Sequence, residues 1–426
     1  MACRWMWWRS CAKICSNRCW TTRAPARWRR SSSLRVAVAG SGIAGLASAA
    51  RLARAGHDVT IFERFDAPRP VGAGLLLQPS GLQALEGLDI RDQVEARGAH
   101  VSRLIGRNMR GRAVLDLRYR DARRDDYGVG IHRASLFDLL LTAAREAGAQ
   151  FRTGCDVASI AGIDTDAPRL SLAGGEETDG FDLVLVCDGA HSRLRRIVCS
   201  QARERVFPWG AFWAIRPDPD GAREGELEQV YDGCRIMIGL LPVGDNPADA
   251  EGRPGVSVFW SVRADAREAV LAAGDEAFRD GFARYWPRAA RAVGDAGLDE
   301  FAYAAYQDAI VPRWRRGRVM LLGDAAHAMS PQLGQGANLA LCDAAALAQA
   351  FAGEARVLHA MKSAERARRP ATTYYSLMSR ALTPVFQSSS KLLGWARDIV
   401  FNLSGRLPGL RHWMGWTLTG RGRMPW

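Results

Sequence analysis

Residues 36–63 read VAVAGSGIAGLASAARLARAGHDVTIFE, and this stretch decides the fold class. Val36 to Ala39 is a short apolar run, which predicts a buried strand. Ile43 to Ala55 is rich in Ala and Leu at helical spacing, and Val59 to Phe62 is a second run with β-branched residues. A strand, a helix and a strand within about thirty residues form a βαβ unit, whose two strands are parallel. We therefore expect an α/β protein with a Rossmann-like domain.

The turn between the first strand and the helix carries a GxGxxG pattern. Its residues are Gly40, Ser41, Gly42, Ile43, Ala44 and Gly45. Gly40 permits a tight turn, Gly42 lets the backbone approach a pyrophosphate, and Gly45 lets the helix pack close to the sheet. The helix N-terminus then offers free N–H groups to the phosphates. A glycine-rich turn with no ligand is the alternative, and the flanking strand and helix argue against it.

An acidic residue closes the second strand, 23 residues after Gly40. Glu63 can accept hydrogen bonds from ribose hydroxyls, and we assign it to the cofactor site together with the adjacent Arg64. A carboxylate at this position disfavours a 2′-phosphate, so the nucleotide is FAD or NAD rather than NADP. The fingerprint alone leaves FAD and NAD open.

Two later segments place further candidate groups at strand ends. The run from Leu183 to Val186 leads into Asp188 and Gly189, and the run from Val319 to Leu322 leads into Gly323 and Asp324. A carboxylate at such a strand end can bind the ribityl hydroxyls of a flavin, whereas an isolated Asp there can also be a helix N-cap. A glycine-rich helix start follows, whose candidate residues are Pro331, Gly334, Gln335, Gly336, Ala337 and Asn338. Its bare N–H groups suit the negative charge that a reduced flavin carries.

The three segments, in this order and at these separations, resemble the FAD-dependent monooxygenases of the para-hydroxybenzoate hydroxylase type. The resemblance spans about Leu34 to Phe351, although residues 207–310 match only in character, and Val186 stands where the family usually has Gly. It implies that Arg133 contacts FAD and that Val157 lies near the adenine.

The resemblance also implies a reaction. NADH or NADPH reduces the flavin, dioxygen forms a flavin hydroperoxide, and one oxygen atom passes to a small aromatic or phenolic substrate. The chain carries no second GxGxxG turn between a strand and a helix, so the nicotinamide is expected to bind transiently. We assign no catalytic residue, and we expect His191 and His327 to pack or to position neighbouring groups.

The composition along the chain suggests four parts. Residues 1–33 form a basic tail that we expect to be disordered. Residues 34–206 and 311–383 form a discontinuous FAD-binding domain. Residues 207–310 alternate aromatic and polar residues and are punctuated by Pro and Gly, which predicts an inserted, mainly antiparallel substrate domain. Residues 384–426 form a C-terminal helical cap.

Charge and lysine content weigh against the alternatives. Residues 1–35 hold nine basic and no acidic residues, so the other 391 carry a net charge of only +4. This disfavours a basic protein that binds nucleic acid or a membrane surface. A flavin-dependent reductase or halogenase of the same fold is the nearer alternative. No lysine occurs from Leu34 to Met361, which leaves a halogenase without its essential lysine.

The cysteines and histidines predict neither a disulfide framework nor a metal site. The nine cysteines are irregularly spaced in a long chain, and no paired histidines follow them. We therefore expect a cytoplasmic enzyme that binds no metal. We also expect a monomer or a homodimer.

The C-terminal segment alternates apolar and basic stretches. Its glycines and Pro408 predict short broken helices rather than one long amphipathic helix. We favour a cap that packs on the two domains or on a second subunit and buries its tryptophans, Trp395, Trp413 and Trp416. A helical segment lying in a membrane interface is the alternative.

Overall fold

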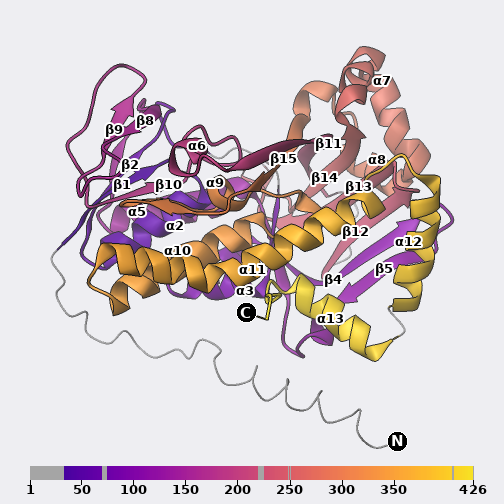
Figure 1. The fold of residues 1–426 in the computed structure, drawn as a ribbon. Coiled ribbons are helices and arrows are strands. Elements are labelled where there is room, and N and C mark those ends of the chain that lie inside the picture. Colours follow the sequence, from indigo (N-terminus) through magenta and orange to yellow (C-terminus); the bar gives the residue numbers. More distant parts are fainter. Residues whose placement is uncertain are drawn as a thin grey trace, which may run out of the picture. The chain divides into compact units, whose positions relative to one another are not determined.

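The structure is a computed structural model, and it describes residues 33–69, 74–218, 225–247, 249, 251–404 and 407–425 (Figure 1). Apart from Ser33, the predicted basic tail of residues 1–33 lies outside the described residues. Residues Leu34–Trp426 form one compact unit.

A six-stranded sheet, with the strand order β16-β17-β10-β1-β2-β7, forms the first layer. All neighbours in it pair in parallel except β16 and β17. The central strands are buried and apolar, as expected when helices cover both faces of a parallel sheet. The strands are β1 (Arg35–Ala39), β2 (Asp58–Phe62), β7 (Gln150–Arg152), β10 (Leu183–Val186), β16 (Arg315–Arg316) and β17 (Val319–Leu321). The predicted Rossmann-like sheet is confirmed.

Helices pack on this sheet and on one another. Helix α2 (Ile43–Arg54) contacts α5 (Arg133–Glu146) and α10 (Gly336–Gly353), and α11 (Val357–Phe386) runs alongside α10 (Figure 1). The sequence predicted α2 and α10 but not α11, which crosses the expected boundary between residues 383 and 384. The shorter helices of this region are α3 (Pro79–Glu86), α4 (Arg91–Arg97), α6 (Arg195–Val198) and α9 (Asp324–His327).

A second sheet of nine strands has the order β15-β11-β14-β13-β12-β4-β6-β3, with β5 paired to β4. Only β12 and β4 pair in parallel, so the predicted mainly antiparallel sheet is confirmed. Its strands are β3 (Leu75–Leu77), β4 (Ala99–Asn108), β5 (Ala113–Arg118), β6 (Gly128–Ile131), β11 (Arg203–Pro217), β12 (Gly225–Asp232), β13 (Ile236–Gly244), β14 (Gly255–Arg263) and β15 (Ala302–Ile310). A separate hairpin joins β8 (Val157–Ala161) to β9 (Arg169–Leu172).

The chain enters the second sheet twice. Strands β3 to β6 come from residues 75–131, which the sequence analysis assigned to the FAD-binding domain, and β11 to β15 come from residues 203–310. The sequence did not predict that residues 75–131 join this sheet, because β3 and β6 are short and arginines interrupt the apolar pattern of β4. The expected limits 34–206, 207–310 and 311–383 therefore remain a proposal, while the second sheet extends beyond residues 207–310.

Helices α7 (Arg267–Tyr285) and α8 (Pro287–Val293) pack on the second sheet (Figure 1). Their core is aromatic: Trp260 stacks on Phe278 with ring centroids 5.5 Å apart and meets Phe282 edge-on at 5.0 Å. Trp260 is therefore a core residue of this domain.

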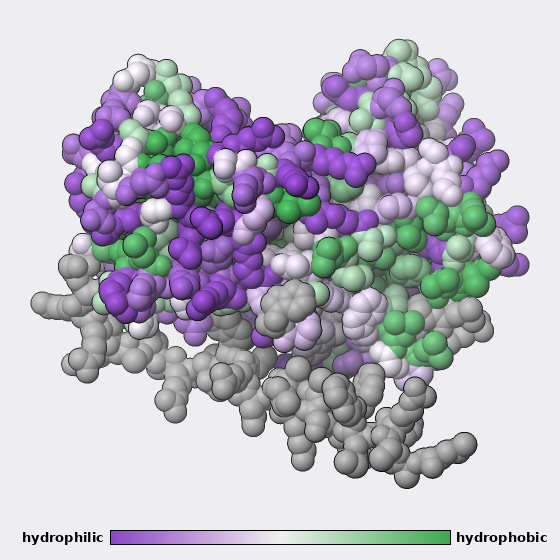
Figure 2. Space-filling model, viewed as in Figure 1, coloured by the Kyte–Doolittle hydropathy of each residue, from purple (hydrophilic) through white to green (hydrophobic). Residues whose placement is uncertain are grey.

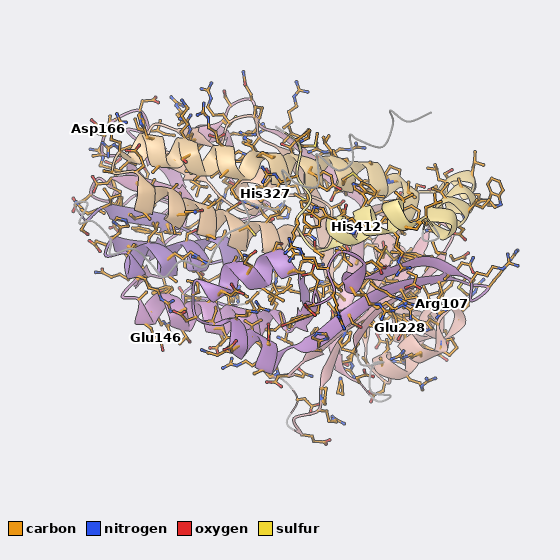
Figure 3. All side chains as sticks on the ribbon, turned by 90° about the horizontal axis from the view of Figure 1, so that it is seen from below. Arg107, Glu146, Asp166, Glu228, His327 and His412 are labelled. Carbon is orange, nitrogen blue, oxygen red and sulfur yellow. The ribbon has the colours of Figure 1, made fainter. Side chains whose placement is uncertain are left out.

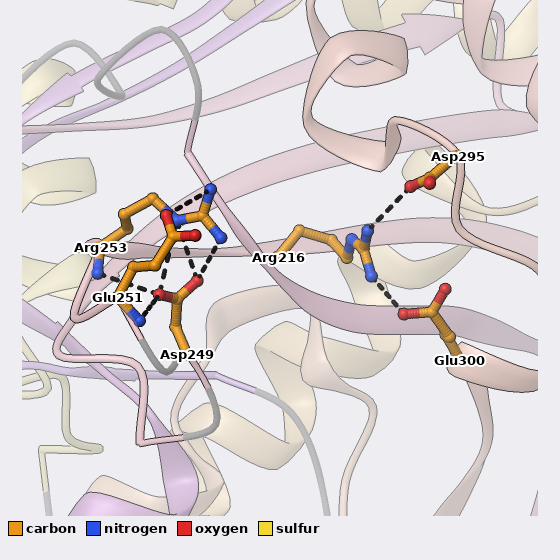
Figure 4. Close-up of polar contacts among 6 residues, drawn as sticks. All are labelled: Arg216, Asp249, Glu251, Arg253, Asp295 and Glu300. Carbon is orange, nitrogen blue, oxygen red and sulfur yellow. Dashed lines mark hydrogen bonds and ion pairs between the residues drawn. The ribbon is translucent and has the colours of Figure 1, made fainter.

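Surface ion pairs fix loops at the edge of this domain. Arg216, near the end of β11, pairs with Asp295 and with Glu300 of the 3₁₀ turn η3 (Leu298–Glu300). Arg253 pairs with Asp249 at 2.9 Å and with Glu251 at 3.2 Å (Figure 4).

The C-terminal segment forms two helices, α12 (Lys391–Ser404) and α13 (Pro408–Leu418), so the predicted break is confirmed. The expected burial of its tryptophans is wrong within this chain for two of the three. Trp395 is 65% exposed and Trp413 is 42% exposed, because the inner faces of these helices are formed by other residues. No helix of the described residues is both long and apolar enough to cross a lipid bilayer.

Candidate active site

Three neighbouring strands end side by side and carry the predicted motifs. The register aligns Ala39 of β1 with Val186 of β10, and Val186 with Leu321 of β17. Backbone hydrogen bonds continue past the strands, from Cys187 N to Ala39 O at 2.8 Å and from Leu322 N to Val186 O at 3.0 Å. Parallel α/β sheets bind their ligands at the carboxyl ends of the strands. The structure therefore brings the three motifs to the edge where such a ligand is expected.

The glycine turn has the geometry that the fingerprint requires. Gly40 has φ +104°, and a Cβ there would lie 2.6 Å from the Cys187 carbonyl oxygen. A Cβ on Gly45 would lie 2.0 Å from the Gly40 carbonyl oxygen, so the α2 helix can pack this closely only with glycine. A Cβ on Gly42 would meet no atom within 4 Å. This open space lies at the N-cap of α2, where no side chain caps the helix.

Glu63 lies against the same turn. Its carboxylate accepts hydrogen bonds from the Ser41 backbone N–H at 3.0 Å and from the Phe65 N–H at 3.1 Å, and it also bonds the Ser41 hydroxyl. Arg64 is exposed and stacks over the Phe65 ring at 4.7 Å. Val157 is buried at the start of β8. Glu63 is thus held beside the turn, as a ribose ligand must be.

A buried arginine links the second and third motifs. Arg195 is fully buried and donates to the carbonyl oxygens of Ala190 at 2.8 Å and Asp324 at 2.9 Å, and it pairs with Glu204 at 3.1 Å. This joins the Asp188–Gly189 turn to the Gly323–Asp324 turn. The sequence analysis gave Arg195 no role. No local pattern marks its link to the Asp324 carbonyl, which lies 129 residues away in the sequence.

Asp188 is half-buried at this turn. Burial raises the pKa of Asp188, and hydrogen bonds from Ser192 and the Leu194 N–H oppose that shift. Its Oδ1 atom has no hydrogen-bond partner among the described residues. At Gly189, with φ +86°, a Cβ would meet nothing within 4 Å. The turn therefore presents an open backbone face and an unused carboxylate oxygen.

Asp324 begins α9 with an exposed side chain. Its Oδ1 lies 3.7 Å from the position of a Cβ on Gly336, so the carboxylate faces the start of α10. Arg133, at the start of α5, lies near enough for electrostatic contact: burial lowers the pKa of Arg133 and Asp324 opposes this. Two candidate residues that are almost 200 positions apart in the sequence thus lie near one another.

The predicted residues at the start of α10 differ in their exposure and in whether their side chains form hydrogen bonds. Pro331 and Gly334 are exposed, and Gly336 and Ala337 are half-buried. Asn338 is fully buried, and its side chain bonds the Gln78 N–H at 2.8 Å and the carbonyls of Leu76 and Gly334. Asn338 therefore fixes the loop through its side chain.

Gln335 joins this loop to the end of the C-terminal segment. Its Nε2 atom donates to the Leu418 carbonyl at 3.0 Å, and its Oε1 atom has no hydrogen-bond partner among the described residues. Nearby, the Ser80 N–H donates to the Thr419 carbonyl at 3.2 Å. The end of α13 therefore packs on the loop that the sequence predicts to hold the flavin ring.

Gln78 is a candidate that the sequence reasoning missed. Its side chain is fully buried, and its Oε1 accepts from the Tyr119 hydroxyl at 2.6 Å. Its Nε2 lies 4.0 Å from the position of a Cβ on Gly334 and has no hydrogen-bond partner among the described residues. A buried donor without a partner is costly unless a ligand satisfies it. No local motif marked Gln78, because its environment comes from distant parts of the chain.

His327 is buried against Asp343 of α10 (Figure 3). Its Nε2 meets Asp343 Oδ2 at 2.5 Å, and Arg368 of α11 donates to Asp343 Oδ1 at 2.7 Å. Burial opposes the charge of Asp343, yet His327 and Arg368 hold its pKa below the usual value. The Gly323 N–H also donates to Asp343 at 3.1 Å, so this network supports the turn before Asp324.

These features fit FAD. The open backbone at Gly42 and Gly189 suits phosphates, and Glu63 and Asp324 supply carboxylates on either side. The buried Nε2 of Gln78 and the bare start of α10 supply donors for a polar ring edge. The fold and the site together define a dinucleotide-binding protein of the Rossmann-like class.

Comparison with known proteins narrows this class. A family model described as an FAD binding domain matches residues 33–374. The 3-amino-4-hydroxybenzoate 2-monooxygenase of Streptomyces cremeus is 33% identical over 322 residues, which cover 74% of this chain and 77% of that protein. The 6-hydroxynicotinate 3-monooxygenase of Bordetella bronchiseptica is 30% identical over 331 residues, covering 74% and 82%. The chain belongs to the FAD-dependent monooxygenases of the para-hydroxybenzoate hydroxylase type.

A solved structure supports the same fold. Klebsiella pneumoniae HpxO in complex with FAD and uric acid superposes with a TM-score of 0.76 at 21% identity, covering 93% of this chain and 99% of that one. The protein is thus an enzyme, an FAD-dependent monooxygenase, and these relationships support neither a halogenase nor a basic binding protein. Among the described residues, no group of three or more His, Cys, Asp or Glu side chains is arranged to hold a metal ion.

Proposed function

We propose that this enzyme hydroxylates a small aromatic or phenolic ring, with NADH or NADPH as electron donor and dioxygen as oxidant. The observation that carries the proposal is the meeting of three motifs at the ends of β1, β10 and β17. Two relatives named for amino- or hydroxy-substituted aromatic acids support the substrate class. Such substituents release electrons into the ring and make it reactive toward an electrophilic oxygen.

In this proposal, each motif binds one part of FAD. The N–H groups at the start of α2 hold the pyrophosphate, and Glu63 holds the adenosine ribose. Asp324 binds ribityl hydroxyls, and Arg133, which lies near Asp324, supplies a fixed positive charge beside them. Val157 and Arg64 border the adenosine end, next to Glu63.

The N–H groups of Gln335 to Ala337 at the start of α10 stabilise negative charge on the pyrimidine edge of the ring. The Gln78 Nε2 donates to the same ring. Bound FAD supplies the redox and oxygen chemistry, while the protein orients the ring, excludes water and stabilises charge. We propose no acid, base or nucleophile from the chain.

Two further properties belong to the proposal. We infer a cytoplasmic location, which the free thiols of the five described cysteines support, because oxidising compartments favour disulfides. We also keep the expectation of a monomer or homodimer that binds no nucleic acid.

The experiment is a coupled assay with isotopic labelling. The purified enzyme, supplied with FAD, is offered NADH or NADPH under ¹⁸O₂ with a panel of phenols, aminobenzoates and hydroxypyridines. We expect at least one ring compound to accelerate nicotinamide oxidation and to leave as a product that contains one ¹⁸O atom. Oxidation that no ring compound accelerates, or products without label, would contradict hydroxylation. Enzyme without added FAD or nicotinamide is the control.

A further inference from the structure

Helix α12 reverses the arrangement of side chains that is usual in a surface helix. Its inner face carries two of its three charged residues, while Lys391 at its start is exposed. Arg397 is fully buried over the rings of Tyr231 and Phe386, at 4.7 and 5.4 Å, and Asp398 bonds Asn108 at 3.0 Å. Its outer face is apolar, and Leu392 is 71% exposed. A surface helix normally directs its apolar stripe to the core and its charges to water.

The apolar face continues onto α13. We call the exposed apolar side chains between Leu392 and Trp413 the C-terminal patch; Trp395, Val400 and Leu407 are its most exposed members after Leu392. Eight of the fourteen exposed large apolar side chains of the described residues lie in this short segment, so the exposure is concentrated. Figure 2 shows it as green surface over α12 and α13. A contiguous exposed apolar surface of this kind marks an interaction site.

Arginines without ion-pair partners border the patch. Asn108, in the β4–β5 hairpin, bonds α12, and Asp121 bonds His412 of α13, so the residues next to them flank the two helices. Figure 3 shows Arg107 on β4 and His412 on α13. None of four arginines near these contacts forms an ion pair with a described residue: Arg107, Arg110, Arg112 and Arg123, the last of which lies over the Trp416 ring of α13. Of the nearby acids, Asp121 pairs with Arg411, while Asp125 and Asp232 are exposed.

Two candidate occupants differ in charge. A second copy of this chain in a symmetric dimer would present the same patch, and would bring the two sets of arginines together. Like charges brought face to face oppose association. An anionic lipid surface instead complements both features, because its headgroups attract arginines and its acyl boundary accepts Leu and Trp side chains. Exposed tryptophans are typical of such interfaces.

We propose that α12 and α13 dock this enzyme onto the surface of an anionic lipid bilayer. The two helices lie in the interface plane, with the C-terminal patch facing the acyl boundary and the flanking arginines facing the headgroups. The docking is peripheral and reversible, and it adds a membrane surface to the partners of the enzyme.

The test is sedimentation of the full chain with vesicles of equal parts phosphatidylglycerol and phosphatidylcholine, and with pure phosphatidylcholine. We expect wild type to bind the mixed vesicles, to bind pure phosphatidylcholine more weakly, and to lose affinity as salt is raised. Leu392→Gln with Leu407→Gln removes apolar area from the patch and should weaken binding by about tenfold or more. The matched control is Leu358→Gln with Leu377→Gln, two leucines of α11 that are 46% and 48% exposed outside the patch, and it should bind as wild type does. Thermal unfolding checks that both variants are folded.

A charge variant separates the lipid from other partners. Arg110→Glu with Arg112→Glu should weaken binding to the mixed vesicles by roughly tenfold or more, and should leave binding to pure phosphatidylcholine little changed. Absence of binding by wild type would overturn the proposal, as would equal binding by the patch variant, which would assign docking to another segment. A wild-type dimer that the patch variant converts to a monomer without vesicles would also overturn it, in favour of a second copy.

Discussion

Asp324 tests the ribityl assignment most directly, because its carboxylate is exposed at a strand end and faces Gly336. An N-cap role is the competing explanation, but Asp324 is the first residue of α9, and the N-cap is Gly323. We predict that Asp324→Ala weakens FAD binding by roughly tenfold to a hundredfold, the range for hydrogen bonds to a charged group. Thermal unfolding of the apoprotein should change little. Asp299→Ala, an exposed carboxylate on η3, is the control and should leave both measurements unchanged.

The role of Gln78 in FAD binding can be tested by changing its Nε2 donor and the partner of its Oε1 acceptor separately. Gln78→Glu keeps an acceptor for the Tyr119 hydroxyl but replaces the donor Nε2 with an oxygen. We predict that this variant binds FAD about tenfold more weakly, because a flavin acceptor then meets a carboxylate. Tyr119→Phe removes the other bond of Gln78 and should retain most of the affinity. Fluorescence titration with FAD measures both, and stronger loss in Tyr119→Phe would show that the pair is only structural.

The network around Asp343 joins α9, α10 and α11. The pKa of Asp343 lies below its usual value in the folded protein, so its charge stabilises the fold above the ordinary carboxyl pKa and this stabilisation is lost as the pH falls through the folded value. We predict that Asp343→Asn lowers the unfolding free energy by about 3 kcal/mol at neutral pH, because it leaves Arg368 buried without its partner. The difference from wild type should shrink below about pH 4. Urea unfolding across this range measures it, and a difference independent of pH would contradict the ionised state of Asp343.

The end of α13 packs closely against the loop before α10, and this close packing requires glycine at position 420. Gly420 has φ +80°, and a Cβ there would lie 1.9 Å from Ser80 Oγ and 3.2 Å from Gln335 Oε1. We predict that Gly420→Val displaces the C-terminal segment, weakens FAD binding severalfold and lowers the melting temperature. Gly409→Val is the matched control, because a Cβ at Gly409 meets nothing within 4 Å. Equal effects of the two substitutions would exclude a specific junction at Gly420.

The chain as a whole shows where sequence reasoning succeeds. The strand–glycine–helix unit of residues 36–63 and the start of α10 were predictable because strand, turn and helix signals lie within a few residues of each other. The role of Gln78 was not predictable, because it depends on contacts with Tyr119 and with Asn338, which lies 260 residues away in the sequence. The first excursion into the second sheet was missed for a similar reason, since β4 pairs with β12 across more than 100 residues. The outward face of α12 also needed the structure, because its spacing is that of an ordinary amphipathic helix.

Titration of the apoprotein with FAD tests whether the strand ends, glycine turns and helix starts together form the flavin site. Apoprotein is titrated with FAD while the flavin fluorescence and the visible absorption spectrum are followed, in wild type and in Gly42→Val, whose side chain would enter the open space at the start of α2. We predict saturation at one FAD per chain in wild type and a large loss of affinity in Gly42→Val, with the fold retained. Absence of saturable binding by wild type, or wild-type affinity in Gly42→Val, would contradict a flavin at the ends of β1, β10 and β17.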